Sequence, residues 1–349
     1  MELSTPQTER KSIVFIEFLR ILASFLVIVN HTNSDIFQTR LPGPVWFASL
    51  TYFYVCRIAV PIFVIIAGYL MLNRQYSYRK CLLLILRILS CLVLFSGVYY
   101  LYYRYLEVVP GINPKFFLQW ITREPITNAY WYLYMYLGLL VMLPFLQKLV
   151  SAMERRDFHV FFGISSAYYA VLPIIQHYCP NFTLSDYFDI SLFGGYICLM
   201  LAGCYLRRYC TFSRKQSGIA LVVFCLITAG NVLLTYWEYC RNYGIGYLFY
   251  GDNSLLPLLA ASIAAFIAAQ GISFSPKTAA RISSLGSLTF GIYLLADLFI
   301  YLLQPIYDTL ILGGYPILFD VLIYELSIFF AGAICTWILK KLPVLRKIL

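Results

Sequence analysis

Charged side chains are scarce in this sequence. Aspartate, glutamate, lysine and arginine make up 12% of its 349 residues, whereas hydrophobic residues make up 61%. Soluble globular domains carry about 25% charged residues, so the composition excludes that class. It predicts a polytopic membrane protein in contact with lipid.

Histidine is rarer still, with three residues, and the ten cysteines form no CxxC pair. Histidines and cysteines nowhere have the spacing of metal ligands, so the sequence predicts no metal site. Most cysteines fall inside apolar segments, as small packing residues do. The sequence also lacks long linkers, soluble domains and internal repeats, which indicates a single membrane domain over residues 1–349.

Long apolar runs are what the sequence has in abundance. A helix needs about 20 apolar residues to cross a bilayer, which predicts an all-α integral membrane protein of about ten transmembrane helices. The first run is too long for a signal peptide and lacks a small-residue cleavage site, so we expect it to remain as a span. The ten runs lie at about 12–33, 45–72, 80–106, 128–150, 157–177, 190–208, 217–238, 254–273, 286–307 and 316–340.

Lysine and arginine collect in alternate segments between the predicted spans. Cytoplasmic segments are enriched in these residues, so we expect both termini in the cytoplasm of a multi-pass cell-membrane protein. The net charge of +10 follows from this bias and does not predict nucleic-acid binding. The longest outer stretch, about 107–127, is a candidate lid or acceptor-docking loop. The outer side keeps only Arg40, Arg104, Lys115, Arg123 and Arg241.

Ionisable residues inside the first span are the most informative feature of the chain. Arg20 and His31 lie eleven positions apart, which places them about 20° apart around a helix and about 16 Å apart along it. Glu17, Ser24 and Asp35 fall within about 60° of the same face. Ionisable groups cost roughly 2.5–3.5 kcal/mol each at mid-bilayer, so we expect this face to line an interior cavity. The alternative is a structural pair of Glu17 and Arg20, with His31 at the interface.

A second buried arginine lies in the next predicted span. Arg57 precedes Pro61 by four residues, and proline removes a backbone hydrogen bond and favours a kink. We expect Arg57 near the depth of Arg20, where two guanidinium groups suit one anionic ligand. The alternative is that Arg57 is paired structurally with Glu17, Asp297 or Glu325.

Other polar residues of the spans allow two interpretations each. Arg87 either continues a basic path towards the same cavity or extends to the interface. Asp297 and Glu325 are isolated acids of the last two spans, and they are either counter-ions of the buried arginines or parts of a proton path. His159 and His177 lie near span ends without partners at catalytic spacing, so we expect both at the interface.

The segment EFLRILASFLVIVNHT resembles the first helix of the acyltransferase 3 family, membrane acyltransferases whose signature is an arginine and a histidine separated by ten residues. Arg20 and His31 match that signature. Softer matches span nearly the whole chain, in RIAVPIFVIIAGYL, YWYLYMYLGLLVMLP, LMLAGCYLRR, SLTFGIYLL and KKLPVLRKIL. Where the family often has two further histidines, this sequence has Ala129 and Ala296.

The resemblance implies transfer of an acyl group, commonly acetyl from acetyl-coenzyme A in the cytoplasm, to a hydroxyl of an extracytoplasmic glycan or cell-envelope acceptor, with no bound cofactor. His31 suits a general base or a carrier of the acyl group, and Asp35 either orients its imidazole or faces solvent. Arg20 suits the developing oxyanion or the donor phosphates. We expect substrate contacts at Glu17, Arg57, Arg87, Trp131 and Tyr132.

Two other functions stay open. Buried charges beside a kinked helix also describe a transport path, so the chain is alternatively an exporter or flippase of a polysaccharide or lipid-linked glycan. Against this, the sequence has no visible inverted repeat. An inactive scaffold is the third possibility, because Ala129 and Ala296 stand where the family often has histidines.

Overall fold

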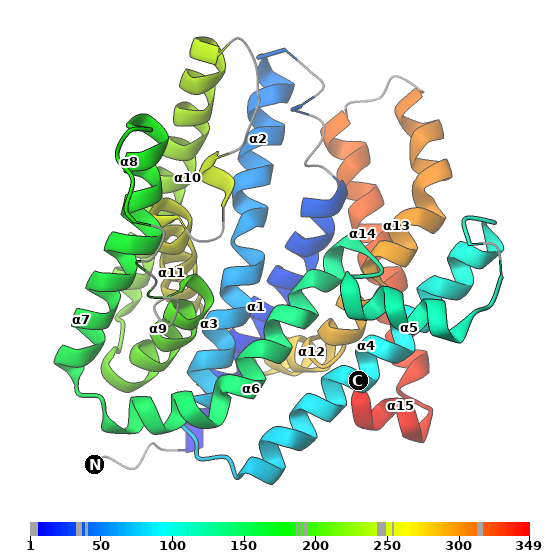
Figure 1. Ribbon diagram of the computed structural model, residues 1–349, viewed down its shortest axis with the longest axis horizontal. Coiled ribbons are helices and arrows are strands. Elements are labelled where there is room, and N and C mark those ends of the chain that lie inside the picture. The colour runs from blue at the N-terminus through cyan, green and yellow to red at the C-terminus, as the bar shows by residue number, and fades with distance from the viewer. Residues whose placement is uncertain are drawn as a thin grey trace. The chain divides into compact units, whose positions relative to one another are not determined.

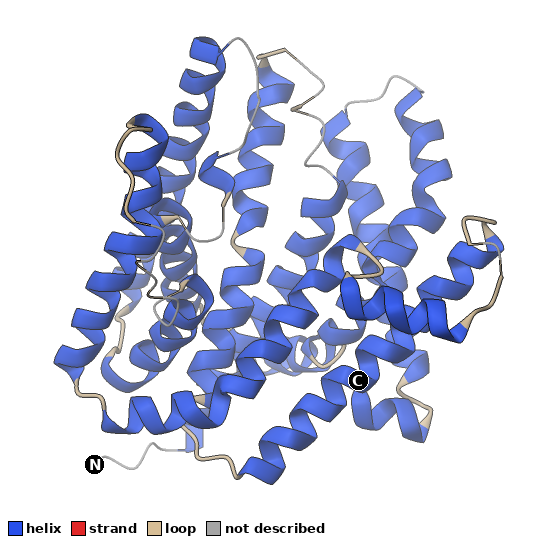
Figure 2. Cartoon of the chain, in the orientation of Figure 1, coloured by secondary structure: helices blue, strands red, loops and turns tan. Residues whose placement is uncertain are grey.

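The computed structural model describes residues 6–32, 37–38, 41–109, 111–185, 188, 190, 194–242, 249–252, 255–312 and 317–349. Across these ranges the chain forms helices joined by turns and short loops, with no strand (Figure 2). Figure 1 follows the helices along the chain. The expected all-α membrane architecture is confirmed.

Eight helical segments of the described chain are long and apolar enough to cross a membrane. Each begins within a few residues of a predicted span, because a run of apolar side chains about 20 residues long is what a bilayer-crossing helix requires. They are Val14–Thr32, Pro44–Met71, Tyr78–Tyr105, Asn128–Ala152, Arg155–Tyr178, Arg214–Arg241, Thr289–Asp308 and Val321–Leu339.

The two remaining predicted spans, 190–208 and 254–273, are shorter helices. They are α9 (Gly195–Tyr209) and α11 (Leu256–Gln270), of 15 residues each. A helix of this length is about 22 Å long, less than the hydrocarbon core of about 30 Å. Both pack against neighbouring helices, α9 against α3 and α11 against α10.

The chain divides into two compact units, each assembled from two separate stretches of sequence. Unit 1 is Met1–Gln75 with Leu146–Gly286, and unit 2 is Tyr76–Phe145 with Ser287–Leu349. Helix α6 (Trp131–Ala152) contributes to both.

Unit 1 is built on the contacts of α1 with α2, α3, α11 and α12, and of α3 with α9. A π-helical turn, η2, joins α7 to α8. Beyond α9 and α11, the helices of this unit are α1 (Pro6–Thr32), α2 (Pro44–Arg57), α3 (Ala59–Met71), α7 (Arg155–Ser165), η2 (Ser166–Val171), α8 (Leu172–Tyr178), α10 (Arg214–Asn242), η4 (Phe249–Gly251) and α12 (Pro276–Gly286).

Two glycines allow α3 and α9 to approach at backbone distance (Figure 1). A Cβ atom on Gly68 would overlap the carbonyl group of Met200, and one on Gly203 would overlap the carbonyl oxygen of Ile65. Small residues are favoured where membrane helices pack this closely. Gly68 and Gly203 therefore fix this helix crossing.

Polar side chains complete the C-terminal end of α3. The guanidinium of Arg207 donates to the carbonyl oxygen of Tyr69 at 3.1 Å, and Gln147 Nε2 donates to that of Met71 at 2.9 Å. Arg208 Nε donates to the side-chain oxygen of Asn73 at 3.2 Å. The last carbonyls of a helix lack partners within the helix, so these contacts stabilise its end.

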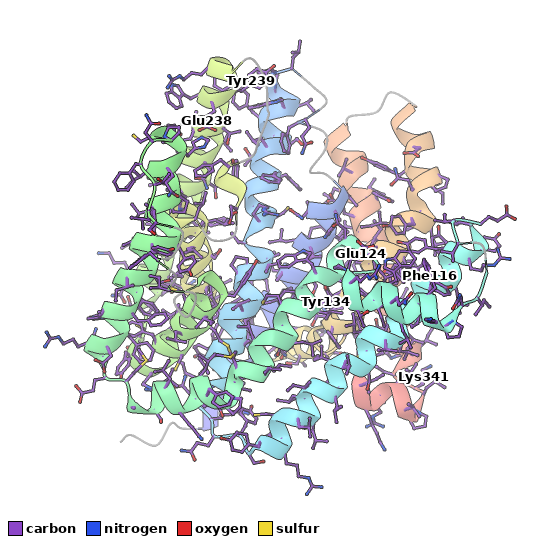
Figure 3. All side chains as sticks on the ribbon, in the orientation of Figure 1. Phe116, Glu124, Tyr134, Glu238, Tyr239 and Lys341 are labelled. Atoms are coloured by element: carbon purple, nitrogen blue, oxygen red, sulfur yellow. The ribbon has the colours of Figure 1, made fainter. Side chains whose placement is uncertain are left out.

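Unit 2 is built on the pairing of α13 with α14, with α4 packed against α13, α5 and α15. Tyr134 of α6 donates to the carbonyl oxygen of Ile121 at 2.5 Å, which fastens α5 (Figure 3). The helices are α4 (Tyr78–Tyr105), α5 (Pro114–Arg123), η1 (Asn128–Tyr130), most of α6, α13 (Thr289–Leu312), α14 (Ile317–Leu339) and α15 (Pro343–Ile348).

Candidate functional site

Arg20 and His31 lie on one uninterrupted helix, α1. Their eleven-position separation therefore places them on one face, about 20° apart. Both side chains are partly buried, whereas Ala23 and Ile28, between them in sequence, are fully buried. Ser24, which lies between Arg20 and His31 on the same face, is only 1% exposed,. The polar stripe is therefore packed against other helices along part of its length.

Glu17 and Arg20 form an ion pair one turn apart, with 2.8 Å between Oε1 and Nη1. The side chain of Arg20 is 34% exposed and that of Glu17 is 16% exposed. The pair that the structural alternative required is therefore present. It takes one of the five N–H groups of the guanidinium, and within the described chain Arg20 makes no other hydrogen bond.

Gly286, the last residue of α12, makes room for this carboxylate. A Cβ atom there would overlap Oε2 of Glu17 and lie 2.9 Å from its Cβ. Oε2 is buried and makes no hydrogen bond to a described residue. The amphipathic helix α12 thus holds Glu17 in position beside Arg20.

His31 lies in the last turn of α1. Its ring makes no hydrogen bond or ion pair with the residues that the structure describes. Asp35, the expected partner of its imidazole, lies outside the described residues. The pairing of Asp35 with His31 therefore stays a prediction.

Arg57 lies where the second span breaks. Helix α2 ends at Arg57, Ile58 forms a turn, and α3 begins at Ala59. The break precedes Pro61, as its missing N–H group predicts. Both α2 and α3 pack against α1.

The Arg57 side chain is held by backbone. Its Nε donates to the carbonyl oxygen of Gly251 in η4 at 2.6 Å, and its guanidinium lies over the Phe53 ring, 5.6 Å from the centroid. Asp252 is the acidic group in electrostatic reach. No contact within the described chain joins Arg57 to Arg20, so their convergence on one ligand stays a prediction.

His177 has a carboxylate partner that sequence spacing did not indicate. Its Nε2 lies 2.7 Å from Oε1 of Glu238, to which Tyr178 also donates at 2.8 Å. Glu238 lies near the end of α10 (Figure 3). The imidazole stacks on Phe249 with 4.1 Å between centroids. Phe249 begins η4, so this cluster fixes the segment that binds Arg57.

Arg87 is engaged by α15. Its Nε donates to the carbonyl oxygen of Ile348 at 2.8 Å and its Nη2 to the oxygen of Leu349 at 3.0 Å. Partial burial, together with the nearby Arg87 and Arg346, lowers the pKa of Lys340. Arg87 thus belongs to a basic cluster, and its contact with a substrate stays a prediction.

Trp131 and Tyr132 begin α6 in unit 2, with ring centroids 6.4 Å apart. Tyr132 also contacts Tyr293 of α13, at 5.8 Å. Tyr293 in turn donates to the carbonyl oxygen of Ala129 at 2.5 Å. Aromatic packing with α13 therefore orients the start of α6.

Asp297 anchors the same turn through hydrogen bonds. It accepts hydrogen bonds from the Thr127 hydroxyl and, at 3.1 Å, from the backbone N–H of Ala129. Ala129 and Ala296, the two positions without the family's histidines, are both buried here. Glu325 is fully buried in α14.

Comparison with known proteins agrees with the resemblance seen in the sequence. A family model described as an acyltransferase domain matches residues 13–341. This match covers both units and includes Arg20 and His31, and it gives no support to the transporter alternative. No curated protein and no solved structure matches the chain.

Proposed function

The chain belongs to the acyltransferase 3 family and is a multi-pass membrane acyltransferase, and we propose that it transfers an acetyl or other short acyl group from acyl-coenzyme A. The proposed acceptor is a hydroxyl group of an extracytoplasmic glycan or cell-envelope molecule. The proposed location is the cell membrane, with the donor bound from the cytoplasm.

One observation carries this proposal. Arg20 and His31, the signature pair, lie on a single face of α1 and both stay partly exposed, although Ser24 between them on that face is buried. A purely structural ion pair explains Glu17 and Arg20 but leaves His31 without a role. Because ionisable residues within membrane spans generally mark functional sites, the pair supports catalysis.

The proposed chemistry is direct acyl transfer. A ring nitrogen of His31 accepts the proton of the acceptor hydroxyl as its oxygen attacks the thioester carbonyl. The tetrahedral intermediate carries its negative charge near His31. Arg20, about 16 Å away along α1 and paired with Glu17 one turn farther off,, is proposed to bind the donor phosphates through its remaining N–H groups. The carbon–sulfur bond then breaks, the proton passes from His31 to the thiolate, and the ester and free coenzyme A leave.

Donor binding is assigned to the arginines. The Nε group of Arg57 is used by Gly251, which leaves its terminal N–H groups for a phosphate. Arg87, Lys340 and Arg346 lie close together in unit 2, and a basic cluster of this kind attracts the anionic donor. Trp131 and Tyr132 are proposed to contact the substrate.

The decisive test replaces the proposed base. His31→Ala should lower acyl transfer about 10²–10⁴-fold, because that is what a general base contributes. The full chain would be reconstituted in vesicles with labelled acetyl-coenzyme A on the cytoplasmic side and glycan extract on the other, and label in the acceptor would be counted. The matched control is His159→Ala. His159 lies on α7, not on α1, and its Nε2 is 2.8 Å from the Tyr205 hydroxyl oxygen.

Three results would contradict parts of this proposal. Full transfer by His31→Ala removes the histidine from the chemistry. Label retained on the protein in the absence of acceptor, and lost in His31→Ala, makes His31 the carrier of the acyl group. Movement of unmodified glycan without donor, in the wild type and in His31→Ala, identifies a transporter.

Donor binding gives a second, separate prediction. Arg20→Ala and Arg57→Ala should each weaken coenzyme A binding about tenfold or more, and lysine should restore only part of it, because an ammonium group lacks the planar fork. Calorimetry on the purified protein measures this directly. Arg156→Ala, an exposed arginine of α7, is the control, and unchanged affinity in both alanine variants would show that the buried arginines are structural.

A further inference from the structure

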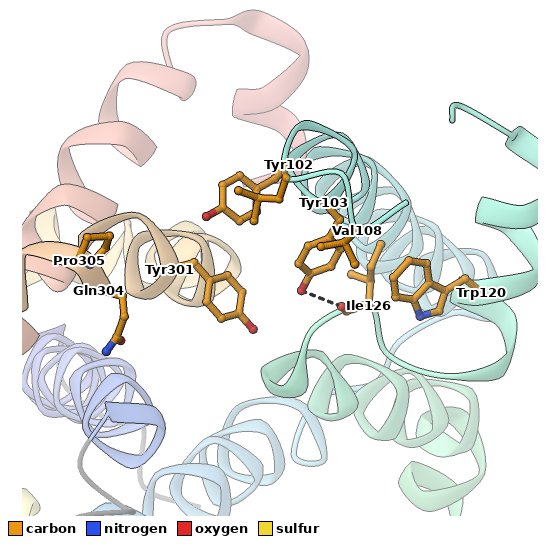
Figure 4. Close-up of a pocket in the computed structure, with 9 residues that line it drawn as sticks. Tyr102, Tyr103, Val108, Trp120, Ile126, Tyr301, Gln304 and Pro305 are labelled. Atoms are coloured by element: carbon orange, nitrogen blue, oxygen red, sulfur yellow. Dashed lines mark hydrogen bonds between the residues drawn. The ribbon is translucent and has the colours of Figure 1, made fainter. Parts of the chain in front are cut away.

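Unit 2 contains a cavity of about 600 Å³ that is lined by none of the site residues proposed above. It is formed by the end of α4, the segment that follows it, α5 and α13 (Figure 4). Cavities that bind small molecules have volumes of about 300–1,000 Å³. This one is therefore large enough to bind a small molecule.

Aromatic rings make up much of the wall. Tyr102 and Tyr301 are stacked within 5° of parallel, with centroids 6.3 Å apart. Tyr103 and Trp120 are stacked within 17°, at 5.9 Å. Figure 4 shows the three tyrosines around the same space, with Trp120 beyond Tyr103. The wall thus offers flat apolar faces with hydroxyl groups at their rims.

The rings are held in place by the backbone. The Tyr103 hydroxyl donates to the carbonyl oxygen of Ile126 at 3.3 Å. Pro305, inside α13, cannot donate to the carbonyl oxygen of Tyr301 one turn earlier,. The usual helical hydrogen bond to that carbonyl is therefore absent beside the cavity.

Charge excludes one class of ligand. None of the described residues that line the cavity is acidic, basic or a histidine. The phosphates of coenzyme A would find no partner here, and burying an unpaired charge is strongly unfavourable. The cavity therefore suits a neutral ligand, which sets it apart from the arginine sites assigned to the donor.

We propose that this cavity binds a neutral sugar ring of the acceptor. A pyranose has C–H groups on its faces and hydroxyl groups around its edge, which matches stacked aromatic faces with polar rims. An acyl chain would pack on the rings but would make no hydrogen bond to their hydroxyl groups, whereas a sugar hydroxyl can donate to a phenol oxygen even where, as in Tyr103, the phenol already donates to the backbone,. This inference rests on the proposed function, in which a glycan is the acceptor.

The location agrees with an extracytoplasmic ligand. In the topology expected from the sequence, α4 and α13 both run outward, and the cavity is lined by residues near their C-terminal ends, such as Leu106 and Pro305. The segment 107–127, expected as an outer acceptor-docking loop, supplies Val108, Trp120 and Ile126.

Binding can be measured without catalysis. The full chain in lipid nanodiscs would be titrated with neutral trisaccharides of glucose, galactose, mannose and N-acetylglucosamine, using saturation-transfer difference NMR. Trp120→Ala should weaken binding about tenfold through the lost ring face, and Tyr301→Phe about fivefold through the lost hydroxyl. Leu118→Ala, an exposed residue of the same helix α5 outside the cavity, is the control and should leave binding unchanged.

Several outcomes would overturn the inference. They are the absence of binding by every trisaccharide, equal binding by wild type and Trp120→Ala, and binding of decanoate or coenzyme A that Trp120→Ala abolishes. Unchanged unfolding temperature of each variant excludes a folding defect. If no sugar binds but His31→Ala still loses acyl transfer, the sugar site is wrong and the proposed function stands. If sugar binding depends on Trp120 but His31→Ala transfers acyl groups fully, only the proposed mechanism is wrong.

Discussion

The position of the Arg20 side chain depends on several other residues. Its guanidinium is bound by Glu17, and Glu17 is placed by the absence of a side chain at Gly286. The spacing of Arg20 and His31 could be read from the sequence because a helix repeats every 3.6 residues. The role of Gly286 could not, since it depends on a contact between residues far apart in the chain.

A prediction follows for Gly286. Gly286→Ala should destabilise the protein by about 1–3 kcal/mol, because the added methyl group overlaps the Glu17 carboxylate. Thermal unfolding in detergent measures the loss, and the penalty should shrink in a Glu17→Ala background. Gly218→Ala, at a helical glycine with no neighbour within 4 Å, is the control. Additive effects of the Glu17 and Gly286 substitutions would contradict the proposed contact.

The sequence predicts the positions of the helices better than it predicts the contacts between them. Apolar runs located eight spans within a few residues, and Pro61 indicated the break that the structure has at Ile58. The runs at 190–208 and 254–273 gave helices of only 15 residues. The predicted span 254–273 continues past the end of α11 at Gln270, because flanking apolar residues look alike in a helix and in a loop. The contacts of Arg87 with α15 and of His177 with Glu238 join distant positions, so no local pattern indicates them.

The crossing of α3 with α9 gives a prediction about elements. Gly68→Ala and Gly203→Ala should each destabilise the protein by about 1–3 kcal/mol or more, because backbone atoms cannot move aside as a flexible side chain can. Fluorescence-detected thermal unfolding is the measurement. Gly97→Ala in α4, where a Cβ atom meets nothing within 4 Å, should be neutral or slightly stabilising. Equal behaviour of all three variants would show that the crossing tolerates a wider spacing.

The topology of the whole molecule can be tested with two of its own cysteines. With both termini in the cytoplasm, Cys179 after α8 lies outside and Cys210 after α9 lies inside. In a background without other cysteines, a membrane-impermeant maleimide should label Cys179 in intact cells and Cys210 only after permeabilisation. The reverse pattern would invert the proposed topology.

In the same experiment, the rate at which the maleimide labels Cys210 should depend on pH. Burial raises the pKa of the Cys210 thiol, and Arg155 lowers it to a smaller extent. Because the thiolate is the reacting species, the labelling rate in permeabilised cells should keep rising with pH beyond the range in which an ordinary cysteine is half ionised. A rate that levels off below pH 8 would contradict the burial of this thiol.

The contact of α3 with α9 also has a consequence for the nascent chain during translation. Gly203 follows Gly68 by 135 positions, so at about 5–20 residues per second a ribosome makes α9 about 7–27 s after α3. During that interval the carbonyl group of Tyr69 lacks its partner Arg207, whereas Gln147, the partner of Met71, is made earlier. Lipid headgroups, water or an insertion chaperone must shield the end of α3 until then. A ribosome that stalls between these helices would leave the carbonyl group of Tyr69 without its hydrogen bond from Arg207.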